Sequence, residues 1–203
     1  YNIQPMLMNT YIATGEGANR YEKIPVQIYE EPATAVVTVA KEIANLIRSK
    51  AEKNEKCVLG LATGSSPIKL YEELVRMHKE EGLSFQNVIT FNLDEYLPMP
   101  KESEQSYHYF MHHHLFDHID IAPANIHIPD GTLTSEEIEK FCKAYDQQIE
   151  SAGGIDLQVL GIGRTGHIGF NEPGSLPTST TRMVYLNDLT IQDAAGDFGG
   201  KDK

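Results

Sequence analysis

Short apolar runs of strand length alternate with helix-length segments along most of this sequence. The apolar runs are CVLGLA from Cys57, VITFN from Val88, IHI at 126–128 and DLQVL at 156–160, with a last strand-like run, TTRMVYL, at 180–186. Strands that are apolar nearly throughout, with helices between them, are typical of a parallel sheet that is covered on both faces. The pattern therefore predicts an α/β fold with a mainly parallel sheet and helices on both faces.

Four segments carry helix signals, and each fits a connection between two strands. The helices are expected from Pro32 to about residue 53, from Pro67 to a stop at Gly82, over 105–116, and from a capping box at Thr134–Glu137 to about Ser151. In a fold of this kind ligands bind beyond the carboxyl ends of the strands. Three of these ends carry polar residues that could do chemistry: Thr63–Ser66, Asp94–Glu95 and the stretch from Gly161 to Glu172.

Composition limits the class of protein and of partner. The 203 residues suit one domain, predicted at 25–203, with residues 1–24 as an N-terminal extension that lacks periodicity. A net charge of −12 repels nucleic acid and anionic membranes, and no apolar run reaches the length of a membrane span. The two cysteines make a disulfide framework improbable, so a reducing cytoplasm is the expected compartment.

The stretch GIGRTGHIGFNEP at 161–173 contains a complete G-x-G-x-x-G, which raises the question of a dinucleotide cofactor. That motif needs a helix directly after its glycines, because the pyrophosphate lies on the helix N-terminus. The residues that follow include two more glycines and two prolines, Pro173 and Pro177. Proline inside a helix costs about 3 kcal/mol and glycine about 1 kcal/mol. No cofactor is therefore predicted, and the glycines are expected to form a loop.

The same loop brings a histidine and a carboxylate close together in the chain. His167 and Glu172 are five residues apart, and a carboxylate can orient and charge an imidazole. The alternative is a satisfied core histidine beside a solvated glutamate, and spacing alone does not decide between the two.

LATGSSP, at 61–67, has the composition of an anion cradle. A strand ends, hydroxyl groups and a glycine follow, and a helix begins with free backbone N–H groups. An ordinary helix N-cap would look similar. Asp94 follows the neighbouring strand, and a partly desolvated carboxylate beside a bound phosphate would suit a general base near neutral pH. A solvated acidic loop is the alternative for Asp94 and Glu95.

Five of the eight histidines fall within 107–118, where His114 and His118 could share a helical face. No H-E-x-x-H and no obvious third ligand accompany them, so no metal site is predicted.

Taken together, these segments resemble the glucosamine-6-phosphate deaminase (isomerase) family. The matching stretches cover roughly residues 33–190 and are LGLATGSSPIKLYEELVRMH, SFQNVITFNLDEYLPM, ESEQSYHYFMHHHLFDHIDI, GGIDLQVLGIGRTGHIGFNEPGS and the Thr181–Arg182 region. The resemblance implies a Rossmann-like fold and the cytoplasmic conversion of glucosamine 6-phosphate and water to fructose 6-phosphate and ammonia, without metal or cofactor.

The resemblance also implies roles for individual residues. The phosphate would lie on Thr63, Gly64, Ser65 and Ser66. Asp94 would move a proton from C2 to C1, and His167 would assist opening of the sugar ring with support from Glu172. Two alternatives stay open: a hydrolase like the 6-phosphogluconolactonases, and a sugar-phosphate-binding domain without catalysis.

Three departures from the family pattern accompany the match. Thr165 stands where an acidic residue or Asn is common, so ring opening is expected to rely more on Glu172. No phosphate-binding Arg appears near Asp193–Phe198, and the early end of the sequence predicts a domain truncated at its C-terminus.

Some relatives are homo-oligomers and some bacterial ones carry a fused deacetylase-like domain, so the resemblance allows for both in this protein. Arg182 matches an effector-binding position in regulated relatives, but Val184 replaces its basic companion, so a surface role is expected.

Overall fold

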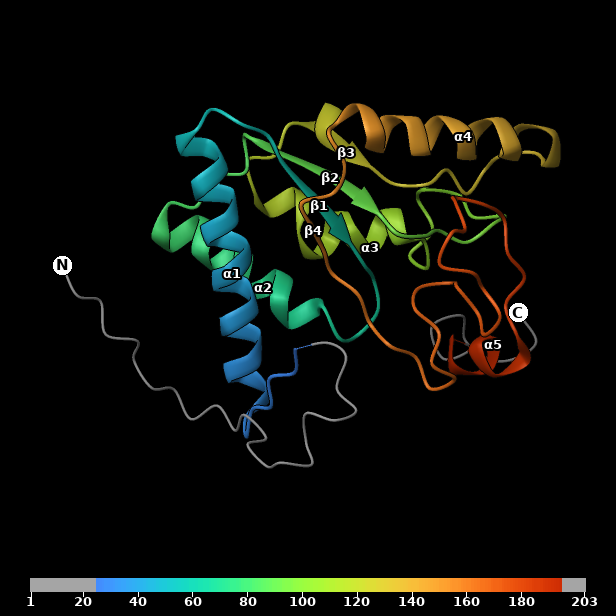
Figure 1. Ribbon diagram of the computed structural model, residues 1–203, viewed down its shortest axis with the longest axis horizontal. Helices are drawn as coiled ribbons and strands as arrows, with labels where there is room; N and C mark the ends of the chain where they lie inside the picture. Colours follow the sequence, from blue (N-terminus) through green and yellow to red (C-terminus); the bar gives the residue numbers. More distant parts are fainter. Residues whose placement is uncertain (1–24, 195–203) are drawn as a thin grey trace.

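The computed structural model describes residues 25–194, where helices and strands alternate along the chain (Figure 1). In chain order the elements are α1 (Pro32–Glu52), β1 (Cys57–Leu61), α2 (Ile68–Glu81), β2 (Val88–Asn92), α3 (Tyr107–His114), the 3-10 helices η2 (Phe116–His118) and η3 (Pro123–Asn125), β3 (Ile126–His127), α4 (Ser135–Ser151), β4 (Leu157–Gln158) and α5 (Asp188–Ala194). The predicted extension, 1–24, and the end of the predicted domain, 195–203, lie outside the described residues.

The four strands form one parallel sheet in the order β3-β2-β1-β4. In the central pair Leu61 lies opposite Asn92, so β1 and β2 end at the same level. The residues that follow them, Thr63 and Asp94, therefore emerge at one edge of the sheet. This architecture confirms the predicted α/β fold with a parallel sheet.

Helices cover both faces of the sheet, as the apolar strands require. On one face Cys57, Leu59 and Leu61 pack with the buried side chains of α1, α2 and α3. On the other face Val58 and Phe91 pack against Tyr145 of α4, which lies apart from α1 and α2 across the sheet in Figure 1. Since successive side chains of a strand point to opposite faces, the run CVLGL has to be apolar at nearly every position.

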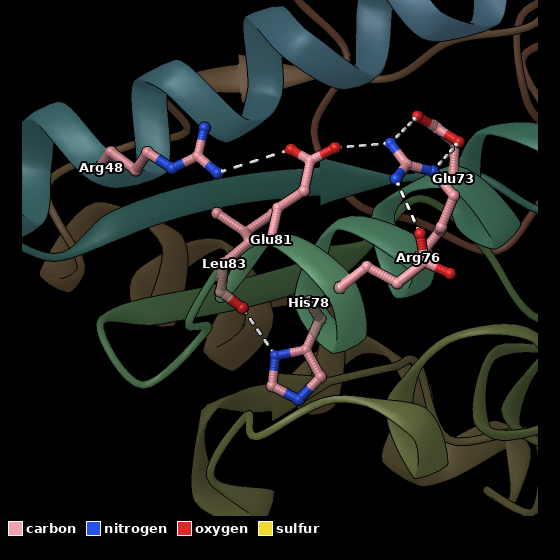
Figure 2. A network of polar contacts seen from close by, with 7 residues as sticks. Arg48, Glu73, Arg76, His78, Glu81 and Leu83 are labelled. Carbon is pink, nitrogen blue, oxygen red and sulfur yellow. Dashed lines mark hydrogen bonds and ion pairs between the residues drawn. The ribbon is translucent and has the colours of Figure 1, made fainter.

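The end of α2 is fixed by polar contacts with its own loop and with α1. Gly82 takes a left-handed conformation (φ 69°), and the N–H of Leu83 bonds to the carbonyl of Met77, so α2 stops where the sequence predicts. Figure 2 shows Arg76 between glutamates of its own helix, and it shows Glu81 reaching across to Arg48 of α1 at 4.0 Å. Apart from Glu73, these side chains are 39–64% exposed, so each exposed pair contributes little stability, about 0–1 kcal/mol.

The predicted elements recur with small shifts at their ends. The helix expected over 105–116 is shorter, because the side chain of Ser106 caps it at the backbone N–H of Tyr109 and η2 follows as a separate turn. The capping box at the start of α4 is confirmed, with the N–H of Thr134 donating to Glu137 at 2.9 Å. None of the helices within residues 25–194 is long and apolar enough to cross a membrane.

The prediction of a strand at 180–186 is wrong. Its apolar and β-branched residues favour a strand locally, but within residues 25–194 the segment does not join the sheet, and its polar groups bond to side chains elsewhere. The N–H and hydroxyl of Thr181 both donate to Asp146 of α4, and Arg182 donates to Asn171 and Ser175. The segment is irregular and leads into α5, a short helix that the sequence patterns did not predict.

Candidate active site

A cavity of about 560 Å³ lies at the carboxyl ends of the strands. All three candidate segments line it: the cradle residues Thr63, Gly64, Ser65 and Ser66, the carboxylate Asp94, and the loop that carries His167. Segments about 30 and 70 residues apart meet here because β1, β2 and β4 are parallel neighbours that end at the same edge. The expected convergence of the strand ends is therefore confirmed.

The cradle has free donors at the start of a helix. Gly64 takes a positive φ of 101°, which turns the chain from β1 toward α2. Gly64, Ser65 and Ser66 are exposed. Within the described residues no side chain caps the first turn of α2, so the ordinary N-cap that these serines could have formed is absent. Exposed hydroxyls beside an uncapped helix N-terminus favour binding of an anion.

Asp94 is a partly buried carboxylate in the wall of this cavity. The pKa of Asp94 is raised to about 7, mainly by burial. A hydrogen bond from the backbone N–H of Phe170 lowers this pKa, and the charge of Glu95 raises it. A Cβ on Gly169 would lie 2.8 Å from the Asp94 Oδ2 atom, so the loop comes close to the carboxylate through a glycine. Such a group can take or give a proton near neutral pH.

Glu95 has a different position from its neighbour Asp94. Its carboxylate accepts backbone N–H bonds from Tyr96 (2.9 Å), Tyr107 (2.9 Å) and His108 (3.0 Å). Two of these N–H groups belong to the first turn of α3, so Glu95 caps that helix from a distant segment. The acidic pair is therefore not one solvated loop, since its two carboxylates serve separate purposes.

His167 is held in a tight glycine-supported loop. The N–H of Gly163 donates to the carbonyl of His167 at 2.8 Å, and the N–H of Gly166 donates back to Gly163 at 2.9 Å. Gly166 has a φ of 83°. A Cβ on Gly163 would lie 2.1 Å from the imidazole Cε1 and Nε2 atoms, so the ring packs directly on this glycine.

No helix follows the glycines before α5, which begins at Asp188. The context that a dinucleotide-binding turn requires is thus missing. The glycines give room to His167 and to Asp94 instead.

Thr165 is the direct partner of the imidazole. Its Oγ1 atom lies 2.8 Å from the Nδ1 atom of His167. Glu172 forms no hydrogen bond with His167, so the pairing that the sequence left open is not a direct hydrogen bond. The carboxylate of Glu172 accepts hydrogen bonds from the backbone N–H and the side-chain amide of Asn187 and from the hydroxyl of Thr190. These bonds tie the histidine loop to the start of α5.

Glu172 still interacts electrostatically with the histidine. The hydrogen bond from Thr190 lowers the pKa of Glu172 most, burial opposes it, and the bond from Asn187 and the nearby His167 lower it further. Glu172 therefore lies close enough to His167 to interact with it electrostatically, without a hydrogen bond to the ring.

Sequence patterns missed an aromatic wall of the cavity. Tyr96, Tyr107 and Phe170 pack against one another with ring centroids 4.9–5.8 Å apart. The Tyr107 hydroxyl donates to that of Tyr96 at 3.2 Å. In the sequence, Tyr107 is one of several aromatic residues in a segment that reads as a packed helix, so nothing marks it as part of a cavity. Its position directly after Ser106, the N-cap of α3, is the one local sign that it lies at the end of the helix.

The histidines of the 107–118 segment make local contacts. His108 stacks on His112, and His112 pairs with Asp117 at 2.8 Å. Across residues 25–194 no group of three or more His, Cys, Asp or Glu side chains is arranged to hold a metal ion.

Comparison with known proteins yields one consistent set of similarities. Residues 30–188 match the family of glucosamine-6-phosphate isomerases and 6-phosphogluconolactonases. A putative glucosamine-6-phosphate deaminase-like protein of Bacteroides thetaiotaomicron is 48% identical over 180 residues, which are 89% of this chain and 27% of that protein. The glucosamine-6-phosphate deaminase of Thermoanaerobacter sp. is 48% identical over 153 residues, or 75% of this chain and 60% of the relative. The chain thus spans less than two thirds of the length of these curated relatives.

Solved structures show the same similarity. A monomeric glucosamine-6-phosphate deaminase superposes with a TM-score of 0.81 at 41% identity, over 86% of this chain and 70% of that one. A 6-phosphogluconolactonase from Thermotoga maritima superposes with a TM-score of 0.55 at 29% identity, over 66% of this chain and 58% of that one.

Proposed function

The chain belongs to the family of glucosamine-6-phosphate isomerases and 6-phosphogluconolactonases, and from this membership we propose that it is a glucosamine-6-phosphate deaminase. The reaction is the conversion of glucosamine 6-phosphate and water to fructose 6-phosphate and ammonia. It combines an aldose–ketose isomerisation with loss of the amino group. The relatives that are 48% identical and the superposed structure at 41% identity bear the deaminase name, which supports this choice within the family.

The observation that carries the proposal is the position of Asp94. A carboxylate with a pKa raised to about 7 lies in the same cavity as an anion cradle and a histidine. Isomerisation requires removal of the proton on C2 and its return to C1, and one carboxylate can perform both transfers. Asp94 would take the C2 proton as a carboxylate, leave an enolamine, and then deliver the proton to C1.

The cradle would fix the substrate through its phosphate. Thr63, Ser65 and Ser66 offer hydroxyl donors, and the uncapped first turn of α2 offers backbone N–H groups. Holding the phosphate at the end of β1 would leave the C1–C2 end of the sugar to reach Asp94, since both segments line one cavity.

His167 would assist opening of the pyranose ring before isomerisation. Its imidazole can relay a proton between the ring oxygen and the anomeric hydroxyl. Thr165 holds the Nδ1 side of this ring, and Glu172 would act through the loop and through its charge.

Ammonia release tests the proposal most directly. Full-length protein is incubated with glucosamine 6-phosphate, and ammonia and fructose 6-phosphate are measured for the native protein and Asp94→Asn. We expect equal amounts of the two products and a loss of about 10²–10⁴-fold in kcat for the variant. Full activity of Asp94→Asn would exclude Asp94 as the base.

The similarity to a lactonase structure, at 29% identity, makes lactone hydrolysis the second candidate. The same preparation is therefore assayed with 6-phosphogluconolactone. Hydrolysis of the lactone without ammonia release would favour the lactonase. Binding of fructose 6-phosphate with neither activity would favour a domain that only binds sugar phosphates.

We also propose a cytoplasmic setting for this protein. Cys57 and Cys142 are both unpaired, which fits a reducing cytoplasm. Residues 25–203 are proposed as one deaminase-like domain that follows an extension at 1–24. A homo-oligomer and a fused deacetylase-like domain stay predictions from the resemblance.

A further inference from the structure

Two buried tyrosines, on helices that cover opposite faces of the sheet, donate hydrogen bonds to the ends of the two central strands. Tyr71 of α2 donates its hydroxyl proton to the carbonyl of Ala62, and Tyr145 of α4 donates to the carbonyl of Asn92 at 2.9 Å. A carbonyl can only accept, so the direction of both bonds is fixed. The paired residues of β1 and β2 end at Leu61 and Asn92, so each bond lies where the chain leaves the sheet.

Tyr71 bonds to both ends of the segment that carries the phosphate cradle. Its hydroxyl holds the carbonyl of Ala62, the residue before Thr63, and its backbone N–H donates to the carbonyl of Pro67 at 2.9 Å, where α2 begins. Because a peptide group is planar, a fixed Ala62 carbonyl also orients the backbone N–H of Thr63. The Tyr71 side chain is fully buried in the core with residues of α1 and β1, so the cradle is anchored to a rigid part of the fold.

Tyr145 fixes the peptide group that leads to Asp94. Its hydroxyl lies 2.9 Å from the carbonyl of Asn92 and 3.1 Å from that of His127, so one proton is shared between the ends of β2 and β3. The N–H of the Asn92 peptide group belongs to Leu93, and it donates to a carbonyl of β1 at 3.0 Å. Both polar groups of this peptide are thus bonded, which determines the direction in which the chain continues to Asp94.

The two phenols are permanent donors. Burial raises the pKa of Tyr71 and of Tyr145, and it outweighs the bonds to the carbonyls, which lower the pKa. Both hydroxyls therefore keep their proton at neutral pH. Ala62 and Asn92 are buried themselves, so a carbonyl that lost its phenol would have little access to water.

We propose that Tyr71 is a positioning residue for the phosphate cradle at 63–66 and that Tyr145 is a positioning residue for the carboxylate of Asp94. This inference rests on the proposed function, because it takes the cradle as the phosphate site and Asp94 as the base. Neither tyrosine is among the residues that line the cavity, so both act through the backbone. Their effects should separate, since a loosened cradle weakens phosphate binding, whereas a displaced carboxylate slows proton transfer.

The first test removes the Tyr71 hydroxyl and keeps the ring. Calorimetry measures the binding of inorganic phosphate and of fructose 6-phosphate to the full-length protein, and turnover of glucosamine 6-phosphate gives kcat and KM. We expect Tyr71→Phe to weaken the binding of both ligands and to raise KM by about three- to tenfold, with kcat changed by less than about twofold. Unchanged phosphate binding in Tyr71→Phe would overturn the role of Tyr71.

Tyr145→Phe is the matched change on the other face of the sheet, and each variant is the control for the other. We expect Tyr145→Phe to lower kcat by about three- to tenfold and to change phosphate affinity by less than about twofold, because it displaces the base and leaves the cradle in place. An unchanged kcat would overturn the role of Tyr145. Equal shifts of KM and kcat in the two variants would overturn both roles, since the hydroxyls would then only stabilise the fold.

Urea unfolding shows whether the loss of a buried hydrogen bond leaves either variant partly unfolded. In that case the native protein and both variants are compared in sucrose, which favours the folded state, and the same contrast between the variants is expected there. Phosphate binding is measured without turnover. A native protein that binds phosphate but releases no ammonia would refute the proposed reaction and the role of Tyr145, while phosphate binding to Tyr71→Phe would still decide the role of Tyr71.

Discussion

The Oγ1 atom of Thr165 lies 2.8 Å from the Nδ1 atom of His167, so the proposed ring-opening histidine has a neutral partner. A carboxylate in that place would accept a hydrogen bond and favour the charged imidazolium. A hydroxyl can donate or accept and adds no charge. Thr165 therefore orients the ring without fixing its charge.

Removal of the Thr165 hydroxyl should impair ring opening. Thr165→Val keeps the shape of the side chain but loses the bond to His167, and we expect kcat with glucosamine 6-phosphate to fall by about three- to tenfold. Thr165→Ser keeps the hydroxyl and should retain most of the activity. Equal kcat values for the Val and Ser variants would show that the bond does not assist catalysis.

Neutralising Glu172 should loosen α5 more than it disturbs the histidine ring. Its carboxylate accepts hydrogen bonds from Asn187 and Thr190, and none from His167. We expect Glu172→Gln to speed amide exchange across residues 188–194 at pH 7, with Glu136→Gln, at an exposed position of α4, as the control. The kcat of Glu172→Gln tests the expectation from the sequence that ring opening depends on the charge of Glu172. Unchanged activity of this variant on the cyclic substrate would refute that expectation.

The Glu172 contacts should also depend on pH. Because Thr190, Asn187 and His167 outweigh burial and lower the pKa of Glu172 in the folded protein, its stabilising effect is present above its ordinary value of 4.5 and is lost as pH falls through the lowered folded value. Protection of residues 188–194 should accordingly fall below pH 4.5 in the native protein and show no such step in Glu172→Gln. A similar step in both proteins would assign it to another group.

The meeting of the candidate site residues in one cavity followed from the sequence because strand ends are a property of the topology. Runs such as CVLGL and VITFN show buried parallel strands, and the residues after them must then meet at one edge. Side-chain partners were less predictable. Glu172 is five residues from His167 in the chain, yet it bonds to Asn187 and Thr190, which come from a segment with no clear helical pattern.

The two carboxylates at 94 and 95 show the same limit. Adjacent side chains on an irregular segment can point in different directions, and no periodicity tells which one enters the cavity. Glu95 caps a helix that begins at Tyr107, twelve residues later in the chain. That contact depends on how α3 packs, which local patterns do not encode.

A methyl group on Gly163 should displace the histidine ring. The new Cβ of Gly163→Ala would lie 2.1 Å from two imidazole atoms, so His167 would have to move. A shift of about 1 Å can cost about a hundredfold in rate, and we expect a loss of that order in kcat. Binding of inorganic phosphate should stay unchanged, since the cradle is a separate segment. Gly161→Ala is the matched control, because a Cβ there meets no atom within 4 Å. Comparable kcat values for the two variants would contradict this packing.

The pH dependence of turnover should report the Asp94 carboxyl. A base works only when it is unprotonated, and burial raises the pKa of Asp94 to about 7. We therefore expect kcat/KM to rise about tenfold per pH unit below pH 7 and to level off above it. The substrate phosphate also ionises near pH 6, so the binding of fructose 6-phosphate is measured over the same range to separate the two effects. A profile that is flat between pH 5.5 and 8 would contradict the role of Asp94.

The same carboxyl should destabilise the folded protein at neutral and higher pH. The ordinary pKa of an aspartate is 3.8, and in the folded protein burial raises that of Asp94 to about 7. The unfolded chain therefore releases this proton first as pH rises. The contribution of Asp94 to stability is complete below pH 3.8, declines between pH 3.8 and 7, and reaches its minimum above pH 7.

Asp94→Asn removes this loss because an amide does not ionise, and its carbonyl oxygen can still accept from the N–H of Phe170. We expect the variant to be more stable than the native protein by about 2 kcal/mol at pH 8, since each tenfold change in proton affinity is worth about 1.4 kcal/mol and solvent access screens part of it. The difference should vanish toward pH 4, as measured by urea unfolding across the pH range. A catalytic carboxylate that is held in a partly dry cavity must lower stability in this way, so a gain in stability together with a loss of ammonia release would tie the two effects to one group. If Asp94→Asn is less stable at pH 8, the carboxylate is solvated there and its raised pKa cannot explain its proposed role as a base.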